Sequence, residues 1–320
     1  MKHLLSLEAL SRGDMESILS RVAGFKSSRA AHARPLAGQT WALIFSKSST
    51  RTRVSFEVGL RELGAEVIFL NAADIQLGRG EPIRDTARVL GRMIHGAVVR
   101  TFAQQDLEDF ASYAGIPTVN ALTDDEHPCQ ILTDIFTYQE LSGLLIGGRQ
   151  VTYVGDAACN VPASWIFAAA RLGFDLRLAA PAAYQPPDSL LHRAGGTPGP
   201  GVAGAPADAS CWYFASGAKV VRTADLDWAA TGSDLLYTDV WVSMGKEAES
   251  ERRIRDLAGY QVNAGLVARA KPGALVMHCL PAYRGKEIDE VTLEAHAATI
   301  FTQAENRLHT QKAIIDWMLD

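Results

Sequence analysis

Two kinds of segment alternate along this chain, and that alternation constrains its fold more than any other feature. Short runs of β-branched and aliphatic residues are separated by longer amphipathic runs, an order typical of α/β proteins with parallel sheets. The expected strands cover residues 41–45, 66–70, 97–101, 117–121, 151–154, 176–179, 219–222, 235–238 and 274–277. The expected helices cover residues 51–63, 82–94, 106–114, 128–141, 163–172, 247–257 and 304–319. The sequence therefore predicts an α/β protein in which mainly parallel sheets are flanked by helices.

The pattern occurs twice, which predicts two domains with a cleft between them. A chain of 320 residues is also longer than a single compact core usually accommodates. The glycine pair at 147–148 marks the expected boundary, so the predicted domains are residues 1–146 and 147–302, each with its own sheet. The last helix could pack on either domain. A stretch rich in Gly, Pro and Ala, residues 195–216, is expected to be a surface loop, and we assign it no function.

The overall composition narrows the possible partners and compartments. The formal charge is −5 and no tract is strongly basic, which argues against nucleic acid or an anionic membrane as the main partner. No run approaches the roughly 18 apolar residues of a membrane span. The 4 cysteines are far apart and never form a CxxC pair, so neither a disulfide framework nor a zinc site is expected. We therefore expect a cytoplasmic protein.

Hydroxyl and guanidinium groups crowd into one short stretch, SSTRTR at residues 48–53. The stretch follows an expected strand and opens an expected helix, where free backbone N–H groups and the positive end of the helix dipole attract anions. Ser49, Thr50 and Thr52 add hydroxyl donors, and Arg51 adds a fork that matches phosphate oxygens. The alternative is an ordinary Ser/Thr helix cap beside solvated arginines. The glycine spacings of a Walker A loop or a dinucleotide fold are absent.

Two further strand ends in the first half carry polar side chains. Arg100 closes the strand GAVVR, and His-Pro-Cys-Gln at 127–130 opens a helix just after another strand. Ligands of open α/β sheets bind at the carboxyl ends of the strands. A histidine at a helix start is usually only a cap. Three such ends on one sheet edge favour instead a shared site for an anionic ligand.

Six segments taken together resemble the ornithine carbamoyltransferase family, in order and over nearly the whole chain. They are SSTRTR (48–53), Arg100, HPCQ (127–130), TDVWVSMG (238–245), MHCLPA (277–282) and QAENRLHTQKA (303–313). STRTR with HPxQ marks the wider aspartate/ornithine carbamoyltransferase superfamily, whereas the SMG and HCLP segments point to the ornithine branch. The resemblance implies transfer of a carbamoyl group from carbamoyl phosphate to the δ-amine of L-ornithine, which gives L-citrulline and phosphate, in the cleft between the domains.

The resemblance also implies which residues bind carbamoyl phosphate. These are Ser49, Thr50, Arg51, Thr52, Arg53, Gln76, Arg100, His127, Gln130, Cys279, Leu280 and Arg307. Arg100, His127 and Thr52 would stabilise the oxyanion that forms as the amine attacks. Gln76 would reach the site of a neighbouring subunit, so the family's homotrimer is the expected assembly. Arg307 would bring the C-terminal helix, about 303–320, to the carbamoyl phosphate-binding domain.

The second domain would bind ornithine through Asn160, Asp239, Ser243 and Met244. The resemblance assigns the catalytic roles to Arg100, His127, Cys279 and Asp239. Before attack the δ-ammonium must lose a proton, and Cys279 with Asp239 would receive it, although the departing phosphate could do so instead. Taken alone, Cys279 could equally be an inert buried thiol and Asp239 a turn cap. No metal and no organic cofactor is required.

Several points stay open at this level. The family usually has two adjacent asparagines after its Gly-Asp pair, whereas GDAACN has Cys159 before Asn160. Carbamoyltransferases for aspartate, putrescine or N-acylornithine would share the cradle and HPxQ but should lack SMG. A non-catalytic sensor of a phosphate ligand could also keep this fold. The direction of the reaction, toward arginine biosynthesis or toward arginine breakdown, is not readable from these residues.

Overall fold

The structure is a computed structural model, and it describes residues 1–29, 31–71, 80–243 and 247–320. The chain divides into two compact units. The first unit is Met1–Phe136 with Glu305–Asp320, and the second is Thr137–Ala304. These units group residues by their contacts, and the domain limits expected at residues 146 and 302 remain a prediction.

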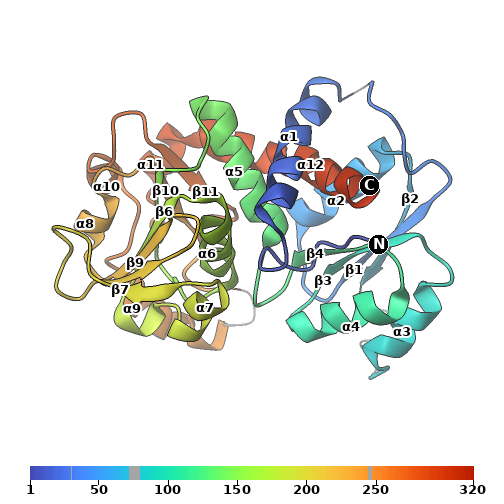
Figure 1. The fold of residues 1–320 in the computed structure, drawn as a ribbon, viewed down its shortest axis with the longest axis horizontal. Coiled ribbons are helices and arrows are strands. Elements are labelled where there is room, and N and C mark those ends of the chain that lie inside the picture. The colour runs from blue at the N-terminus through green and yellow to red at the C-terminus, as the bar shows by residue number, and fades with distance from the viewer. Residues whose placement is uncertain (30, 72–79, 244–246) are drawn as a thin grey trace. The chain divides into compact units, whose positions relative to one another are not determined.

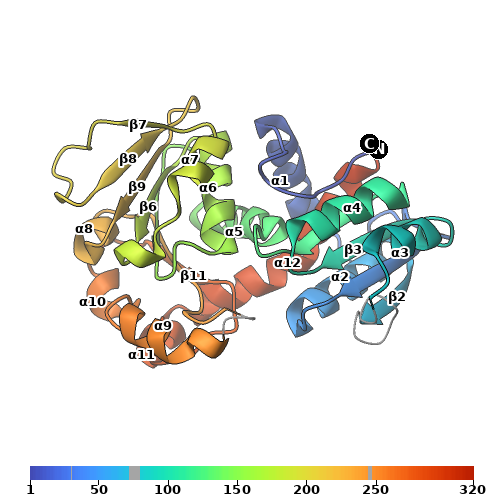
Figure 2. The ribbon, with the colours of Figure 1, turned by 90° about the horizontal axis from the view of Figure 1, so that it is seen from below.

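The first unit is built on a parallel sheet of four strands in the order β2-β1-β3-β4. The strands are β1 (Thr40–Phe45), β2 (Glu66–Asn71), β3 (Gly96–Arg100) and β4 (Thr118–Leu122). The helices are α1 (Arg12–Ser27), α2 (Thr50–Glu62), α3 (Ile83–Leu90), α4 (Gln104–Ala114), the first part of α5 (Pro128–Ser142) and the last part of α12 (Ala297–Met318). Helices α3 and α4 cover one face of the sheet through a shared apolar cluster, and α2 with α12 lies on the other (Figures 1 and 2).

The second unit is built on a sheet of seven strands in the order β11-β10-β5-β6-β9-β8-β7. The strands are β5 (Gln150–Val154), β6 (Asp175–Ala179), β7 (Thr197–Gly199), β8 (Ser210–Tyr213), β9 (Lys219–Thr223), β10 (Leu235–Thr238) and β11 (Leu275–His278). The helices are α6 (Asn160–Leu172), α7 (Asp188–Arg193), α8 (Leu226–Ala230), α9 (Ser250–Leu257), α10 (Ala264–Val267) and α11 (Glu290–Ala295). The β7–β8 and β8–β9 pairings are antiparallel, and the other pairings among these strands are parallel. The predicted α/β class with two mainly parallel sheets is confirmed.

The expectation of a plain surface loop at residues 195–216 is wrong, because that stretch contains β7 and β8. Strand β8 pairs with β9, and Cys211 and Trp212 are buried on it. The Trp212 ring packs edge-on against His192, with ring centroids 4.7 Å apart. The strand was missed because it has only four residues and the sequence around it is rich in residues that indicate turns and loops.

Helix boundaries also differ from the expectation in places. Helix α1 was not predicted, although Ser11 and Asp14 form a capping box at its start. Helix α3 ends at Leu90 rather than at Ile94, and α12 begins at Ala297 rather than near residue 304. No helix within the described ranges is both long and apolar enough to span a membrane.

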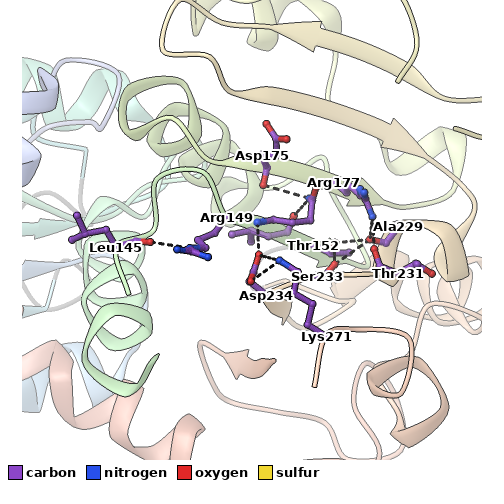
Figure 3. Close-up of polar contacts among 12 residues, drawn as sticks. Leu145, Arg149, Thr152, Asp175, Arg177, Ala229, Thr231, Ser233, Asp234 and Lys271 are labelled. Carbon is purple, nitrogen blue, oxygen red and sulfur yellow. Dashed lines mark hydrogen bonds and ion pairs between the residues drawn. The ribbon is translucent and has the colours of Figure 1, made fainter. Parts of the chain in front are cut away.

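Polar side chains tie together the amino-terminal part of the second sheet (Figure 3). The Asp234 carboxylate accepts from the Gln150 backbone N–H at 2.8 Å and from Lys271 Nζ at 2.8 Å. Arg177 Nη1 donates to the carbonyl oxygens of Trp228, Ala229 and Thr231 at the end of α8. These bonds satisfy strand and helix ends at one rim of the sheet. The loops that carry the candidate site residues leave from the opposite, carboxyl rim.

Helices α3 and α4 approach so closely at Gly91 that a side chain there would collide with backbone. A Cβ added to Gly91 would lie 1.9 Å from the Ala114 carbonyl oxygen. We expect Gly91→Ala to lower the free energy of unfolding by about 3 kcal/mol, measured by urea denaturation, because the helices must separate. The control is Gly24→Ala in α1, where nothing lies within 4 Å and a gain of up to about 1 kcal/mol is expected. Equal stability of Gly91→Ala and wild type would contradict this packing.

Candidate active site

The hydroxyl-rich stretch forms the start of α2, directly after β1. Ser49 is the N-cap residue, and its hydroxyl accepts from the Thr52 backbone N–H at 3.2 Å. Thr50 is exposed and Arg51 is half-buried. The ordinary helix cap is therefore present at Ser49, and the neighbouring Thr50 and Arg51 side chains remain accessible, so the anion cradle stays a prediction.

Thr52 is the point where distant parts of the first unit meet. It is fully buried, and its Oγ1 accepts from Arg307 Nη2 at 2.7 Å and from Arg100 Nη1 at 3.5 Å. Arg307 comes from α12, and Arg100 is the last residue of β3. The structure thus brings together two predicted guanidiniums on one hydroxyl at the mouth of α2.

His127 and Gln130 lie at the start of α5, and both are buried. Burial, together with the nearby positive charges of Arg307 and Arg100, holds the pKa of His127 well below its usual range. The imidazole is therefore neutral at pH 7. Gln130 Nε2 donates to Asp134 Oδ1 at 2.8 Å, and Gln130 Oε1 is buried with no hydrogen-bond partner among the described residues.

Three further residues in this part of the chain are Arg53 and Gln76, which the sequence predicted for the site, and Lys47, which it did not. Arg53 is exposed, lies 3.7 Å from the centroid of the Phe69 ring and pairs with Glu57 at 3.5 Å. The sequence reasoning missed Lys47, which follows β1 by two residues, is buried and forms an ion pair with Asp124. A lysine beside the hydroxyl cluster was the available signal. Gln76 lies outside the described residues.

In the second unit, Asp239 and Cys279 follow the neighbouring parallel strands β10 and β11. Cys279 Sγ donates to Asp239 Oδ1 at 2.9 Å, and the Val240 backbone N–H donates to the same oxygen at 2.7 Å. Burial raises the pKa of Asp239. A thiol and a carboxyl group of raised proton affinity are therefore in direct hydrogen-bond contact.

His278 and Glu287 support this pair, and the sequence reasoning missed both. His278 Nε2 lies 3.2 Å from Glu287 Oε1, and His278 Nδ1 accepts from the Leu280 backbone N–H at 2.9 Å. Leu280 has a backbone φ of 59°, which residues other than glycine rarely adopt. Asp239, His278 and Cys279 have ligand atoms within 4.8 Å of one another, but those two contacts engage both imidazole nitrogens. The trio is thus arranged for hydrogen bonding rather than for a metal.

The turn after β5 leads to Asn160, the first residue of α6. Asn160 and Ser243 are half-buried, and Met244 lies outside the described residues. Cys159 is buried, its Sγ donates to the Asp156 carbonyl oxygen at 3.2 Å, and burial raises the pKa of its thiol well above the usual range. The cysteine in place of the expected asparagine is therefore a small neutral group within the turn.

A buried ion pair fixes this turn to the start of α9. Arg253 Nη1 donates to Asp156 Oδ2 at 2.6 Å, and Arg253 Nε donates to Glu249 Oε2 at 2.8 Å. The second oxygen of Asp156 accepts from the Ala158 backbone N–H at 3.0 Å. Asp156 and Arg253 also line a cavity with Tyr184. The segment after Ser243 and the turn before Asn160 are therefore joined within one unit.

Family models and relatives of known type match the chain along almost its full length. The model for the aspartate/ornithine carbamoyltransferase carbamoyl-P binding domain matches residues 2–140, and that for the Asp/Orn binding domain matches residues 147–318. The ornithine carbamoyltransferase of Akkermansia muciniphila is 49% identical over 100% of this chain and 99% of its own, and that of Campylobacter fetus is 45% identical over 99% and 98%.

Solved structures agree with these sequence relatives. The anabolic ornithine carbamoyltransferase of Campylobacter jejuni superposes with a TM-score of 0.89 at 36% identity, covering 99% of each chain. The ornithine carbamoyltransferase of Pyrococcus furiosus gives a TM-score of 0.87 at 39% identity, covering 99% of this chain and 96% of its own. The likeness therefore extends over both predicted domains.

Breaking the buried pair at Arg253 should destabilise the protein. The side chains of Arg253 and Asp156 are 7% and 2% exposed, so Arg253→Gln leaves a buried carboxylate without its partner. We expect a loss of about 3 kcal/mol in the free energy of unfolding, measured by denaturant titration. Arg252→Gln is the matched control, because Arg252 is 59% exposed and pairs with the same Glu249 at 3.1 Å. Similar losses in both variants would refute a special role of the buried pair.

The depressed pKa of His127 should make stability depend on pH. Its pKa is lower in the folded than in the unfolded chain, so protonation favours unfolding, and the contribution of His127 is full above about pH 6.5 and lost as the pH falls below it. Between pH 6.5 and 5.5 wild type should lose about 1 kcal/mol more stability than His127→Gln, measured by urea denaturation at both pH values. Parallel pH profiles would mean that the pKa of His127 is the same in the folded and unfolded chain, which would contradict this expectation.

Proposed function

The chain belongs to the aspartate/ornithine carbamoyltransferase family, and we propose that it transfers the carbamoyl group of carbamoyl phosphate to the δ-amine of L-ornithine, giving L-citrulline and phosphate. The observation that carries the choice of ornithine is the identity of 49% and 45%, over essentially the full chain, with ornithine carbamoyltransferases. The geometry of each unit supports the chemistry that this reaction requires.

The phosphate would bind at the start of α2. Backbone N–H groups, the helix dipole and the side chains of Ser49, Thr50, Arg51 and Thr52 supply donors to a dianion. Arg307, within 2.7 Å of Thr52 Oγ1, adds a second guanidinium. Arg53 has the least support, since it stacks on Phe69 and pairs with Glu57.

The carbonyl oxygen of the carbamoyl group gains negative charge during attack, and Thr52, Arg100 and His127 would stabilise it. Thr52 Oγ1 already accepts hydrogen bonds from two guanidiniums, so its own hydrogen is available to the substrate. A neutral imidazole still donates one N–H. The buried Gln130 Oε1 suits the carbamoyl NH₂ as an acceptor.

Ornithine would bind in the second unit, with Asp239 on its α-ammonium group and Asn160, Ser243 and Met244 near its amino-acid end. Cys279 and Leu280 would lie beside the reacting amine. We propose that the δ-ammonium passes a proton to Cys279 Sγ as the thiol proton moves to Asp239 Oδ1, which frees the nitrogen lone pair for attack. The 2.9 Å contact and the raised pKa of Asp239 support this relay. The amine nitrogen then forms a bond to the carbamoyl carbon, the carbon–oxygen bond to phosphate breaks, and the departing phosphate takes the second proton from the nitrogen.

We also propose a cytoplasmic homotrimer that acts in arginine biosynthesis, without a metal or an organic cofactor. The anabolic character of the Campylobacter jejuni relative supports the pathway. Gln76 of a neighbouring subunit would complete each carbamoyl phosphate site.

Release of phosphate from carbamoyl phosphate tests the proposal, with L-ornithine, L-aspartate, putrescine and N-acetylornithine offered as acceptors, and citrulline is the carbamoylated product expected with ornithine. We expect ornithine to be the best acceptor, and Arg51→Ala and Arg100→Ala each to lower kcat/KM by about 100-fold or more, because each removes a charged donor from the transition state. Arg61→Ala is the control, since Arg61 lies in the last turn of the same helix and pairs with Glu57. Faster turnover of another acceptor would reject ornithine, and phosphate-ligand binding without turnover would identify a sensor.

A further inference from the structure

Helix α12 contacts the start of α2 through Arg307, so the position of this guanidinium depends on how the two helices pack. Gly59, which is buried on α2, lets the two helices approach closely. A Cβ at this position would lie 3.3 Å from Lys312 Cγ, 3.4 Å from Leu308 Cδ1 and 3.7 Å from the Leu308 carbonyl oxygen. A glycine therefore lets the α12 side chains lie directly against the α2 backbone.

Lys312 adds a charged contact at the same place. Its side chain is 0% exposed, and Nζ donates to Glu62 Oε2 at 2.7 Å, at the end of α2. Nζ also lies 3.2 Å from His32 Nε2 and 5.6 Å from the centroid of the Phe25 ring. Glu62 accepts in addition from Arg29 Nε at 2.8 Å. One buried ammonium group thus holds α12 to α2 and to the segment that follows α1.

A buried ion pair of this kind is weak evidence for stability, because desolvation offsets the attraction and apolar residues of similar size would serve as well. What distinguishes such a pair is that its hydrogen bond depends on the positions of both groups. It therefore fixes one register of α12 on α2, whereas apolar contacts would let one helix slide along the other. Arg307 and Lys312 are five residues apart, which is about 7.5 Å along a helix. If α12 slid along α2, the short helical segment between the two residues would move as a unit. Arg307 would then move away from Thr52 by the same distance as Lys312 moves from Glu62.

We propose that Lys312 and Glu62 are positioning residues for the phosphate side of the site: their ion pair fixes the register of α12 on α2 and so sets the place of the Arg307 guanidinium. The inference rests on the proposed function and deepens it. Lys312 itself is fully buried and engaged with Glu62, so it acts through Arg307 and does not touch the substrate.

The test measures the KM for each substrate in Lys312→Met and in Glu62→Gln. We expect the KM for carbamoyl phosphate to rise about 5- to 20-fold, while the KM for ornithine at saturating carbamoyl phosphate changes less than about 2-fold, because only the Arg307 contact is displaced. Arg29→Gln is the matched control, since Arg29 binds the same carboxylate but is 52% exposed, and it should leave both KM values unchanged.

A double-mutant cycle with Arg307→Gln separates positioning from general destabilisation. If Lys312 acts through Arg307, then Lys312→Met should raise the KM for carbamoyl phosphate no further in the Arg307→Gln background. Additive effects, or a lowered melting temperature with an unchanged KM, would overturn the inference. Glu62→Gln provides the same measurement should Lys312→Met fail to fold.

The outcome remains distinct from that of the proposed function. A wild-type protein that forms no citrulline would reject the function, and calorimetric titration with inorganic phosphate would then test the same register. We expect weaker phosphate binding in Lys312→Met than in wild type or Arg29→Gln. Equal binding in all three, or none in wild type, would overturn the inference.

Discussion

The hydrogen bond from Arg307 to the buried hydroxyl of Thr52 is the contact on which the phosphate half of the site depends. It connects the last helix of the chain to the first helix after β1, and it draws Arg100 to the same oxygen. Two guanidiniums and the start of α2 concentrate positive potential in a water-poor place. Burial and the positive charges of Arg307 and Arg100 lower the pKa of His127, so its imidazole is neutral rather than a third cation.

The acceptor half follows an opposite electrostatic logic. Here the Cys279 thiol donates to the Asp239 carboxyl group, and burial raises the pKa of Asp239, which favours its uncharged form. His278 sets the turn at Cys279 and Leu280 by accepting from the backbone, and Glu287 orients the imidazole. In the proposed reaction, a leaving dianion and an amine that must become neutral require different surroundings, and the two groups of residues described here differ in this way.

Much of the fold was predictable because buried parallel strands are short aliphatic runs ended by glycine or polar residues. Strand β10 occupies the predicted residues, and β1 differs by one residue. Strand β8 was not predictable in this way, since its pairing with β9 decides its conformation and its sequence neighbours favour turns. Helix α1 was missed although its buried positions, Met15, Ile18, Leu19 and Val22, have the i, i+3, i+4, i+7 spacing of an amphipathic helix.

The residues of the candidate site likewise fall into those that the sequence could predict and those that it could not. Arg100, at a strand end, could be singled out because ligands of α/β sheets bind at such ends, whereas Asp239 and Cys279 were assigned through the family resemblance. Partners such as Asp156 with Arg253, or Glu62 with Lys312, are separated by 97 and 250 residues. No spacing rule connects them, and only the fold reveals that these charges are buried together.

The polar ties of Arg177, Asp234 and Lys271 near the amino ends of the second sheet (Figure 3) have a consequence for how this architecture can diversify. These polar contacts hold the chain at the amino ends of the strands. The residues proposed to bind the amine lie on loops at the carboxyl ends. Mutations in these loops can therefore change acceptor preference without destabilising the sheet. A replacement such as Cys159, in one of these turns, is a substitution of that kind.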